Sequence, residues 1–148
     1  MSARFEDPLA FQVLNEIGIV AQLAGNRMER LMPPGLSMAG FFVLNHFVRL
    51  GGERSPLALA RAFQVSKGAM TNTVQRLEAA GWVSVSPDPK DGRAKRVAIT
   101  EAGRAVREAC VARLGPSLAE VETGVGQPRL EALLPELRRL RAWLDANR

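Results

Sequence analysis

The feature that most constrains the fold is a pair of helix starts in close succession. Ser55-Pro56 and Ser66 each place a serine where its side chain can accept hydrogen bonds from the free N–H groups at a helix N-terminus. Only Gln64-Val65 separates the first of these helices, about two turns long, from the second cap. Two short helices joined by a tight turn, with the second helix longer, are typical of a helix-turn-helix.

The second of these helices divides into two sides at 100° per residue. We expect one side to face the core, and it holds Ala69, Met70, Thr73, Val74 and Leu77. The opposite side is short, polar and flat near the N-terminus, as in a recognition helix that meets base edges. Asn and Gln can pair two-handed with adenine, Lys can reach guanine or phosphate, and glycine allows close backbone approach. A plain solvated face is the alternative. The predicted contact residues are Lys67, Gly68, Thr71, Asn72 and Gln75.

A two-stranded hairpin is predicted after this helix. Gly81 is expected to end the helix in the left-handed conformation. The segments 82–85 and 97–99 alternate as strands do, and a tip with two prolines and a glycine lies between them. The unit is therefore a winged helix. Asp91 and Arg93 stand two residues apart at the tip, where the carboxylate can orient the guanidinium through a charge-assisted pair. An ordered Arg suits a narrow, electronegative minor groove.

The whole net charge of the chain lies on this unit. Residues 54–96 contain eight Lys or Arg against three Asp or Glu, a net charge of +5, and the remainder of the chain is neutral. A solvated basic face is one explanation, but charge confined to one segment favours a polyanion, since neutralised phosphates release counterions. We therefore expect double-stranded DNA as a partner. The further basic residues expected to contact it are Arg54, Lys90, Lys95 and Arg96.

The sequence before this unit predicts two helices. Asp7-Pro8 has the form of a helix start, and an apolar stripe follows over about 24 residues to Leu31. The stripe is longer than a domain of this size needs, so we expect part of it to pack on a second chain. A second helix, capped by Ser37 and ending at Gly51-Gly52, is apolar nearly all round and is expected to be buried on most sides.

Two more helices are predicted after the hairpin. The first starts at Thr100-Glu101, and Gly115-Pro116 is expected to kink or divide it. After a break at residues 124–126, leucines recur at helical spacing to the end of the chain, with a kink or restart expected at Pro135. This stripe is suited to packing on a partner helix. The predicted fold class is mainly α, with a small β-hairpin.

Composition excludes several classes of function. A chain of 148 residues is one domain by length, and no apolar run approaches the roughly 20 residues that cross a bilayer. With no signal peptide and one cysteine, Cys110, we expect a cytoplasmic protein without an internal disulfide. One histidine, His46, no tyrosine and no glycine-rich phosphate loop argue against an enzyme. One His and one Cys cannot close a zinc site, so no cofactor is expected. Cys110 is expected to be a buried thiol.

Several segments of the sequence together resemble a known family. The runs 59–67, 74–78 and 81–83, followed by 88–93 and 97–103, resemble the winged helix-turn-helix of the MarR family of bacterial transcription regulators. The resemblance implies a homodimer built by the first and last two helices, and binding to a pseudo-palindromic operator, usually as a repressor. It often implies release by a small, commonly aromatic or phenolic, effector. The family's wing arginine and its partner acid correspond to Arg93 and Asp91. Recognition contacts correspond to Ser66, Lys67, Thr71, Asn72 and Gln75, and the nearest effector candidates are Phe42 and His46.

The resulting prediction is a single winged-helix regulator domain over residues 1–148. Residues 54–100 form its DNA-binding lobe, and residues 7–32 and 101–148 supply dimerisation helices. The alternatives are an enzyme and a winged-helix module that binds DNA without sequence preference or serves protein contacts. The clustered charge argues against protein contacts.

Overall fold

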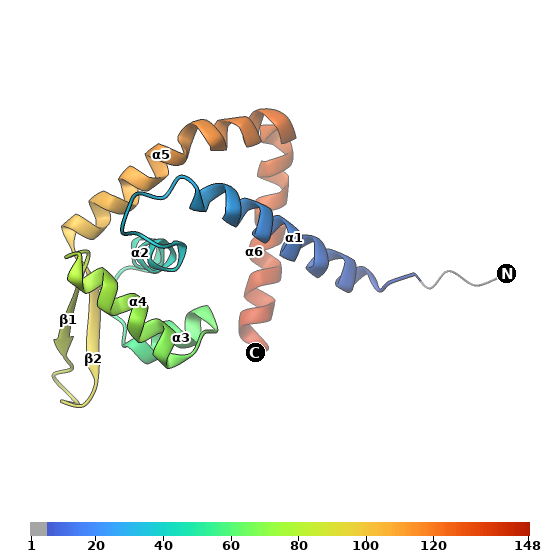
Figure 1. Cartoon of the computed structure of the whole chain (residues 1–148). Coiled ribbons are helices and arrows are strands. Elements are labelled where there is room, and N and C mark those ends of the chain that lie inside the picture. Colours follow the sequence, from blue (N-terminus) through green and yellow to red (C-terminus); the bar gives the residue numbers. More distant parts are fainter. Residues whose placement is uncertain (1–5) are drawn as a thin grey trace. The chain divides into compact units, whose positions relative to one another are not determined.

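The computed structural model describes residues 6–148 and is mainly α-helical with one two-stranded hairpin, as predicted (Figure 1). The chain divides into two compact units, residues up to 110 and residues 111–148. None of the helices described combines the length and apolarity needed to cross a membrane. The elements in chain order are α1 (Leu9–Glu29), α2 (Met38–Leu50), α3 (Pro56–Phe63), α4 (Lys67–Ala79), β1 (Val83–Pro87), β2 (Lys95–Ile99), α5 (Glu101–Val125) and α6 (Gln127–Ala146).

The core of the first unit forms around α2, which contacts α1, α4 and β2. Ser37 caps α2 by accepting from the Gly40 N–H at 3.1 Å, and Gly51 ends the helix with φ +65°, both as predicted. The expectation of burial on most sides holds only in part, because Phe42 and Leu50 are exposed. The largest side chains with almost no exposed surface are Phe47, Leu44, Leu59, Val43, Val97 and Cys110.

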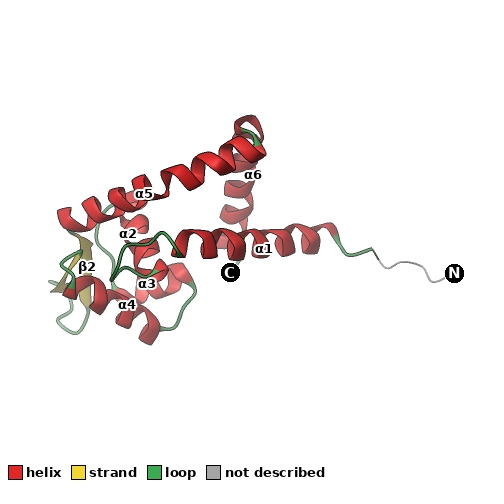
Figure 2. Ribbon diagram, turned by 45° about the horizontal axis from the view of Figure 1, so that its top comes forward, coloured by secondary structure: helices red, strands yellow, loops and turns green. Residues whose placement is uncertain are grey.

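The two strands pair antiparallel in the register Val83 to Ile99 and Pro87 to Lys95 (Figure 2). A further contact, which the sequence did not predict, joins the hairpin to the segment before α3. The Arg54 N–H donates to the Val97 carbonyl at 3.0 Å, and the Val97 N–H donates back at 2.8 Å. This bridge ties the wing to the start of the helix-turn-helix.

The N-terminus of α1 differs from the prediction. The helix begins at Leu9 with Pro8 as its cap residue, and no side chain caps it. The backbone carbonyl of Asp7, and not its carboxylate, is engaged, and it accepts from Gln12 Nε2 at 2.7 Å. No residue of α1 is buried.

Two prolines were each expected to kink their helix or to divide it; the division is wrong, and the kink stays a prediction. Pro116 lies inside α5, and Pro135 lies inside α6, and both helices run on without interruption. A proline removes one N–H donor from a helical ladder, and long helices retain enough other bonds to continue through it. The break predicted at residues 124–126 is confirmed, since Gly126 separates the two helices with φ +99°.

Candidate nucleic-acid interface

Local hydrogen bonds build the helix-turn-helix as the sequence predicts. Ser55 Oγ accepts from the Ala58 N–H and Ser66 Oγ accepts from the Ala69 N–H, each at 3.1 Å. Between them, Gln64 adopts the left-handed conformation with φ +54°, and Val65 N–H closes the turn on the Ala60 carbonyl at 3.0 Å. These bonds satisfy donors and acceptors that helix ends leave free, so the turn is short and defined.

The outward side of α4 lies open, as predicted. Lys67, Gly68, Asn72 and Gln75 are exposed, and Thr71 is half-buried. Ser66 is also exposed, but its hydroxyl oxygen is engaged as the cap of α4. A DNA contact by Ser66 would therefore use its hydroxyl proton, which the cap leaves available.

The structure corrects the predicted burial of one residue of α4 and adds another residue to its open side. Ala69 was expected in the core but is exposed, whereas Met70, Val74 and Leu77 are buried. On a helical wheel Ala69 lies about 100° from the centre of the buried side, so the predicted apolar side was too wide. Arg76 is exposed and lies about 40° from Asn72 on the same wheel. The sequence interpretation missed Arg76, although helical phase alone places it beside the reading face.

The turn after α4 is locked to the start of α5. Gly81 has φ +77°, and the Trp82 N–H donates to the Leu77 carbonyl at 2.9 Å, which closes a Schellman cap. Thr100 Oγ1 then donates to the Gly81 carbonyl at 2.7 Å. The C-terminal end of α4 is thus held by Thr100, the residue directly before α5.

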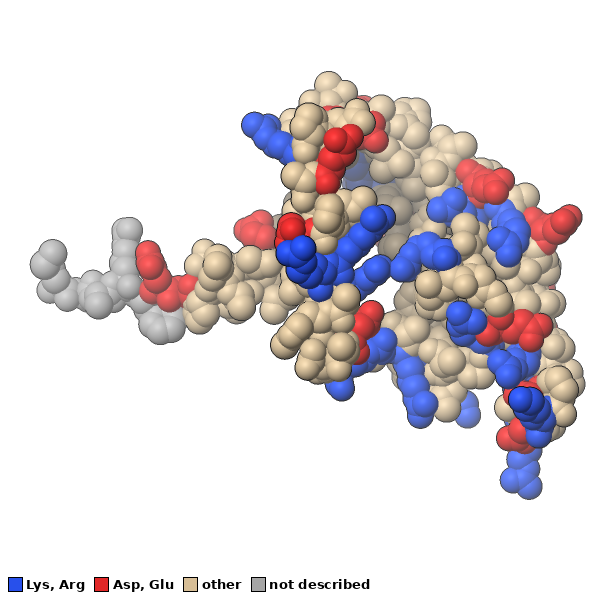
Figure 3. Space-filling model, turned by 180° about the vertical axis from the view of Figure 1, so that it is seen from behind, with Lys and Arg blue, Asp and Glu red and all other residues tan. Residues whose placement is uncertain are grey.

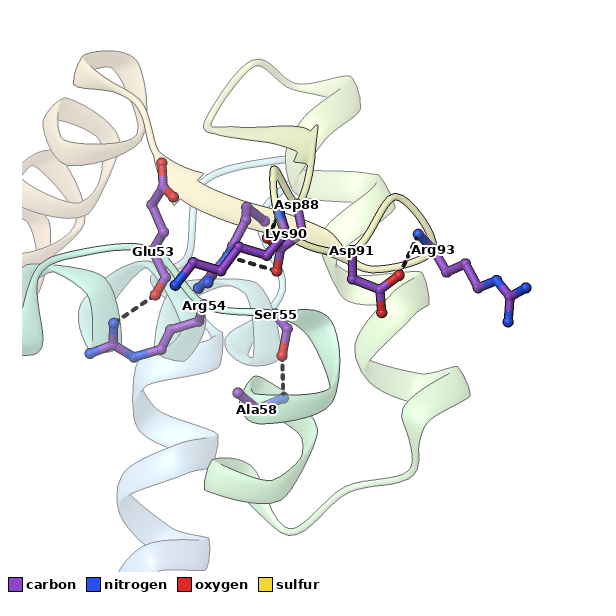
Figure 4. A network of polar contacts seen from close by, with 9 residues as sticks. Glu53, Arg54, Ser55, Ala58, Asp88, Lys90, Asp91 and Arg93 are labelled. Carbon is purple, nitrogen blue, oxygen red and sulfur yellow. Dashed lines mark hydrogen bonds and ion pairs between the residues drawn. The ribbon is translucent and has the colours of Figure 1, made fainter.

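Two carboxylates shape the wing tip, but not in the way predicted. Asp91 Oδ1 accepts from the backbone N–H of Arg93 at 3.0 Å, and the Arg93 guanidinium extends away from that carboxylate (Figure 4). The expected Asp91–guanidinium pair is therefore wrong, because a side chain two residues earlier reaches the backbone donor first.

Asp88 holds the other half of the tip. Its Oδ1 accepts from the Lys90 N–H at 2.9 Å, and its Oδ2 lies 3.3 Å from Arg96 Nε. The sequence interpretation gave Asp88 no role, although an Asp-x-Lys turn is a visible signal for the first bond. The ion pair thus engages Arg96, while the Lys90, Arg93 and Lys95 side chains remain exposed.

A groove brings five of the predicted contact residues together. It has a volume of about 400 Å³ and is bordered by the start of α3, the start of α4 and the wing. The predicted residues that line it are Lys67, Thr71, Asp91, Arg93 and Lys95. Figure 3 shows blue side chains projecting from the surface at the lower right, where the wing lies.

Arg54 lies apart from this group. Its backbone forms the bridge to Val97, and its guanidinium donates to the Glu53 carbonyl at 2.7 Å. In Figure 4 the Arg54 and Arg93 side chains extend toward opposite ends of the view. The sequence grouped the two by charge, whereas the fold separates them.

The two effector candidates lie in different surroundings. Phe42 lines a groove of about 340 Å³ between α1 and α2, together with Gly18, Gly25 and Met38. His46 instead faces Phe63 of α3, with ring centroids 5.3 Å apart.

Burial, with the nearby charges of Arg54 and Arg49, lowers the pKa of His46 below its usual value of 6.5. A neutral imidazole packed beside the Phe47 and Phe63 rings is typical of a residue at the rim of a core. Within residues 6–148, no three His, Cys, Asp or Glu side chains are grouped so that they could hold a metal ion.

Comparison with known proteins identifies the fold family. The model of the MarR family matches residues 35–94. The multiple antibiotic resistance protein MarR of Escherichia coli is 29% identical over 113 residues, which cover 73% of this chain and 78% of the relative. The crystal structure of a cysteine-to-serine mutant of MarR from E. coli superposes with a TM-score of 0.74 and 27% identity, covering 91% of this chain and 97% of that chain. The resemblance of the sequence to the MarR family is therefore confirmed.

One of the similar structures contains DNA. The MarR mutant has been solved with operator DNA, and that structure matches with a TM-score of 0.65 and 28% identity, covering 88% of this chain and 99% of that chain. MarR-family proteins are transcription regulators. The winged helix described above is therefore the part of this chain that resembles the DNA-binding element of MarR-family regulators.

Proposed function

We propose that the protein is a homodimeric, sequence-specific repressor that binds a pseudo-palindromic operator, each copy contacting one half-site through residues 54–100. The observation that carries this proposal is the convergence of the open α4 side with the basic wing. Lys67 and Thr71 from α4 line one groove with Arg93 and Lys95 from the wing. A helix in the major groove and a basic wing beside it would use these two surfaces together.

Each surface suits a different part of DNA. Asn72 and Gln75 are exposed amides that can pair two-handed with adenine, and Lys67 can reach guanine or phosphate. The exposed Arg93 and Lys90 side chains at the wing tip suit phosphates or a narrow minor groove. Base contacts set sequence choice, and phosphate contacts set register and overall affinity.

Exposed apolar surface supports the assignment of residues 7–32 and 101–148 as dimerisation helices. In α1, Leu9 is 75% exposed and Leu23 is 66% exposed, and in α6 Trp143 is 62% exposed. Neither α1 nor α6 buries any residue within the single chain. Contiguous apolar surface of this kind is typical of a protein interface, and a second copy is the partner that a two-fold operator needs.

We place a small aromatic effector in the groove beside Phe42. Its volume of about 340 Å³ lies at the small end of ligand pockets, and one side of it is α1. A ligand there would contact a proposed dimerisation helix and α2 at once. It could therefore favour one arrangement of the two lobes over another. His46 does not line this groove and is left out of the effector site.

The test is a binding-site selection on the purified protein, with its mass in solution measured by light scattering. We expect a dimer and an enriched palindrome whose half-sites lie about one helical turn, roughly 34 Å, apart. Repeating the selection with aromatic acids and their thioesters tests the effector. Enrichment of DNA without a palindrome would support a non-specific architectural role instead, and no DNA binding would support a protein-interaction module.

A further inference from the structure

The first three turns of α5 are held against the DNA-binding lobe along a single stripe. Thr100 Oγ1 accepts from the Gly103 N–H at 3.0 Å, and the Thr100 N–H donates to the Trp82 carbonyl at 3.1 Å. Gly103 is buried where the helix passes the Trp82 carbonyl. Steps of three and four residues keep the stripe on one side of the helix. Its members are Thr100, Gly103, Arg107 and Cys110.

Arg107 is the charged member of this stripe, and it binds α2. Its Nε and Nη2 both donate to Asn45 Oδ1, at 3.2 Å and 2.9 Å. Both residues are half-buried, and 62 positions separate them in the sequence. This bond therefore joins two helices that are far apart in the chain, whereas the bond of Gln22 to Asn26 joins neighbouring turns of one helix.

The geometry of this bond makes it directional. Two N–H groups on one edge of a planar guanidinium converge on one oxygen, so rotation of α5 against α2 would lengthen at least one bond. In the described part of the chain Arg107 forms no salt bridge with a carboxylate. Its restraint on α5 therefore comes from oriented hydrogen bonds and not from a non-directional charge pair.

We propose that the Arg107–Asn45 bond sets the direction in which α5 leaves the lobe, and through it the half-site spacing that the dimer accepts. This inference rests on the proposed function, since spacing has meaning only for a paired binder. The stripe connects the recognition helix to the proposed dimerisation segment. Thr100 and Gly103 contact the turn that ends the recognition helix, and α5 continues into the proposed dimerisation segment 101–148. Arg107 and Asn45 are thus positioning residues that need not touch DNA.

The experiment measures spacing preference and not affinity alone. The full-length protein is titrated by fluorescence anisotropy against the selected operator, against operators with one or two base pairs added or removed between half-sites, and against a duplex with one half-site. Each added base pair rotates one half-site by roughly 34°, so wild type should lose on the order of tenfold in affinity per step. Asn45→Leu removes the acceptor at similar volume, and Asn45→Asp retains it.

The inference predicts that Asn45→Leu reduces the penalty per base pair to less than about threefold, with single half-site binding within about twofold of wild type. Asn45→Asp should restore the wild-type penalty. If circular dichroism shows that Asn45→Leu does not fold, Arg107→Lys, which retains the charge but loses the two-donor edge, replaces it. A folded variant with the wild-type spacing penalty would overturn the inference. A wild-type protein with no spacing preference would instead overturn paired binding, and the inference with it.

Discussion

A single methyl group at Gly103 tests how α5 is seated on the lobe. A Cβ at this position would lie 2.0 Å from the Trp82 carbonyl oxygen, 3.0 Å from the Trp82 carbonyl carbon and 2.9 Å from Ile99 Cγ1. The Ile99 side chain can move, but the carbonyl belongs to the turn that ends α4 and already accepts from the Thr100 N–H. Gly103→Ala must therefore displace α5 by about 1 Å or distort the turn.

The cost follows from two opposing terms. Overpacking against backbone costs about 1–3 kcal/mol, and more where the neighbour cannot move. Alanine recovers up to about 1 kcal/mol over glycine through helix propensity. Because the contact is far inside van der Waals distance, we place the net loss near 3 kcal/mol. For a chain of this size that corresponds to a fall of about 6–12 °C in Tm.

The assay is urea unfolding followed by tryptophan fluorescence, at one fixed protein concentration because a dimer's stability depends on it. Gly124→Ala is the matched control, since Gly124 lies in the same helix and an added Cβ there meets nothing within 4 Å. The control should be neutral or up to about 1 kcal/mol more stable. If Gly103→Ala unfolded within about 0.5 kcal/mol of wild type, the described contact between α5 and Trp82 would be wrong.

Three further predictions concern the site and His46. Arg93→Ala should weaken operator and scrambled DNA alike and flatten the salt dependence of binding, because it removes a backbone contact; anisotropy titrations at several salt concentrations measure this. Asn72→Ala should cost on the order of 1–3 kcal/mol on operator but little on scrambled DNA, and an equal loss on both would refute its reading role. The unfolding free energy should fall as pH drops below 6.5. His46 then binds a proton in the unfolded chain, whereas its lowered pKa keeps the imidazole neutral to lower pH in the folded chain. His46→Gln should flatten that slope in parallel denaturation curves, and an unchanged slope would contradict the assignment.

The predictable parts of the fold are those that short-range chemistry decides. The serine caps at Ser37, Ser55 and Ser66 each bond to an N–H three residues ahead, so sequence spacing alone reveals them. The left-handed stop at Gly81 is equally local. The open side of α4 follows from helical phase, and the prediction erred only at its edges, where Ala69 was placed in the core and Arg76 was missed.

Long-range contacts explain most of what the sequence could not show. The bridge of Arg54 to Val97 joins segments 43 positions apart, and one residue pair has no strand signature. The bond from Arg107 to Asn45 likewise depends on which turn of α5 passes α2. Helical spacing gives the side of each helix but not its neighbour across the core.

The Asp91 error has a different cause, because the two groups are indeed close in sequence. A carboxylate at a turn can accept from a guanidinium or from the backbone two residues on, and the backbone bond orders fewer rotatable bonds. The same preference appears at Asp88, whose carboxylate binds the Lys90 N–H.

Asp88 and Asp91 therefore both shape the loop, although their negative charges reduce the net positive charge of the wing. What they secure is the backbone that carries Lys90 and Arg93, and those side chains stay exposed. An acid in a basic wing is then consistent with polyanion binding, because one oxygen of each carboxylate accepts from a backbone N–H while Lys90 and Arg93 face solvent.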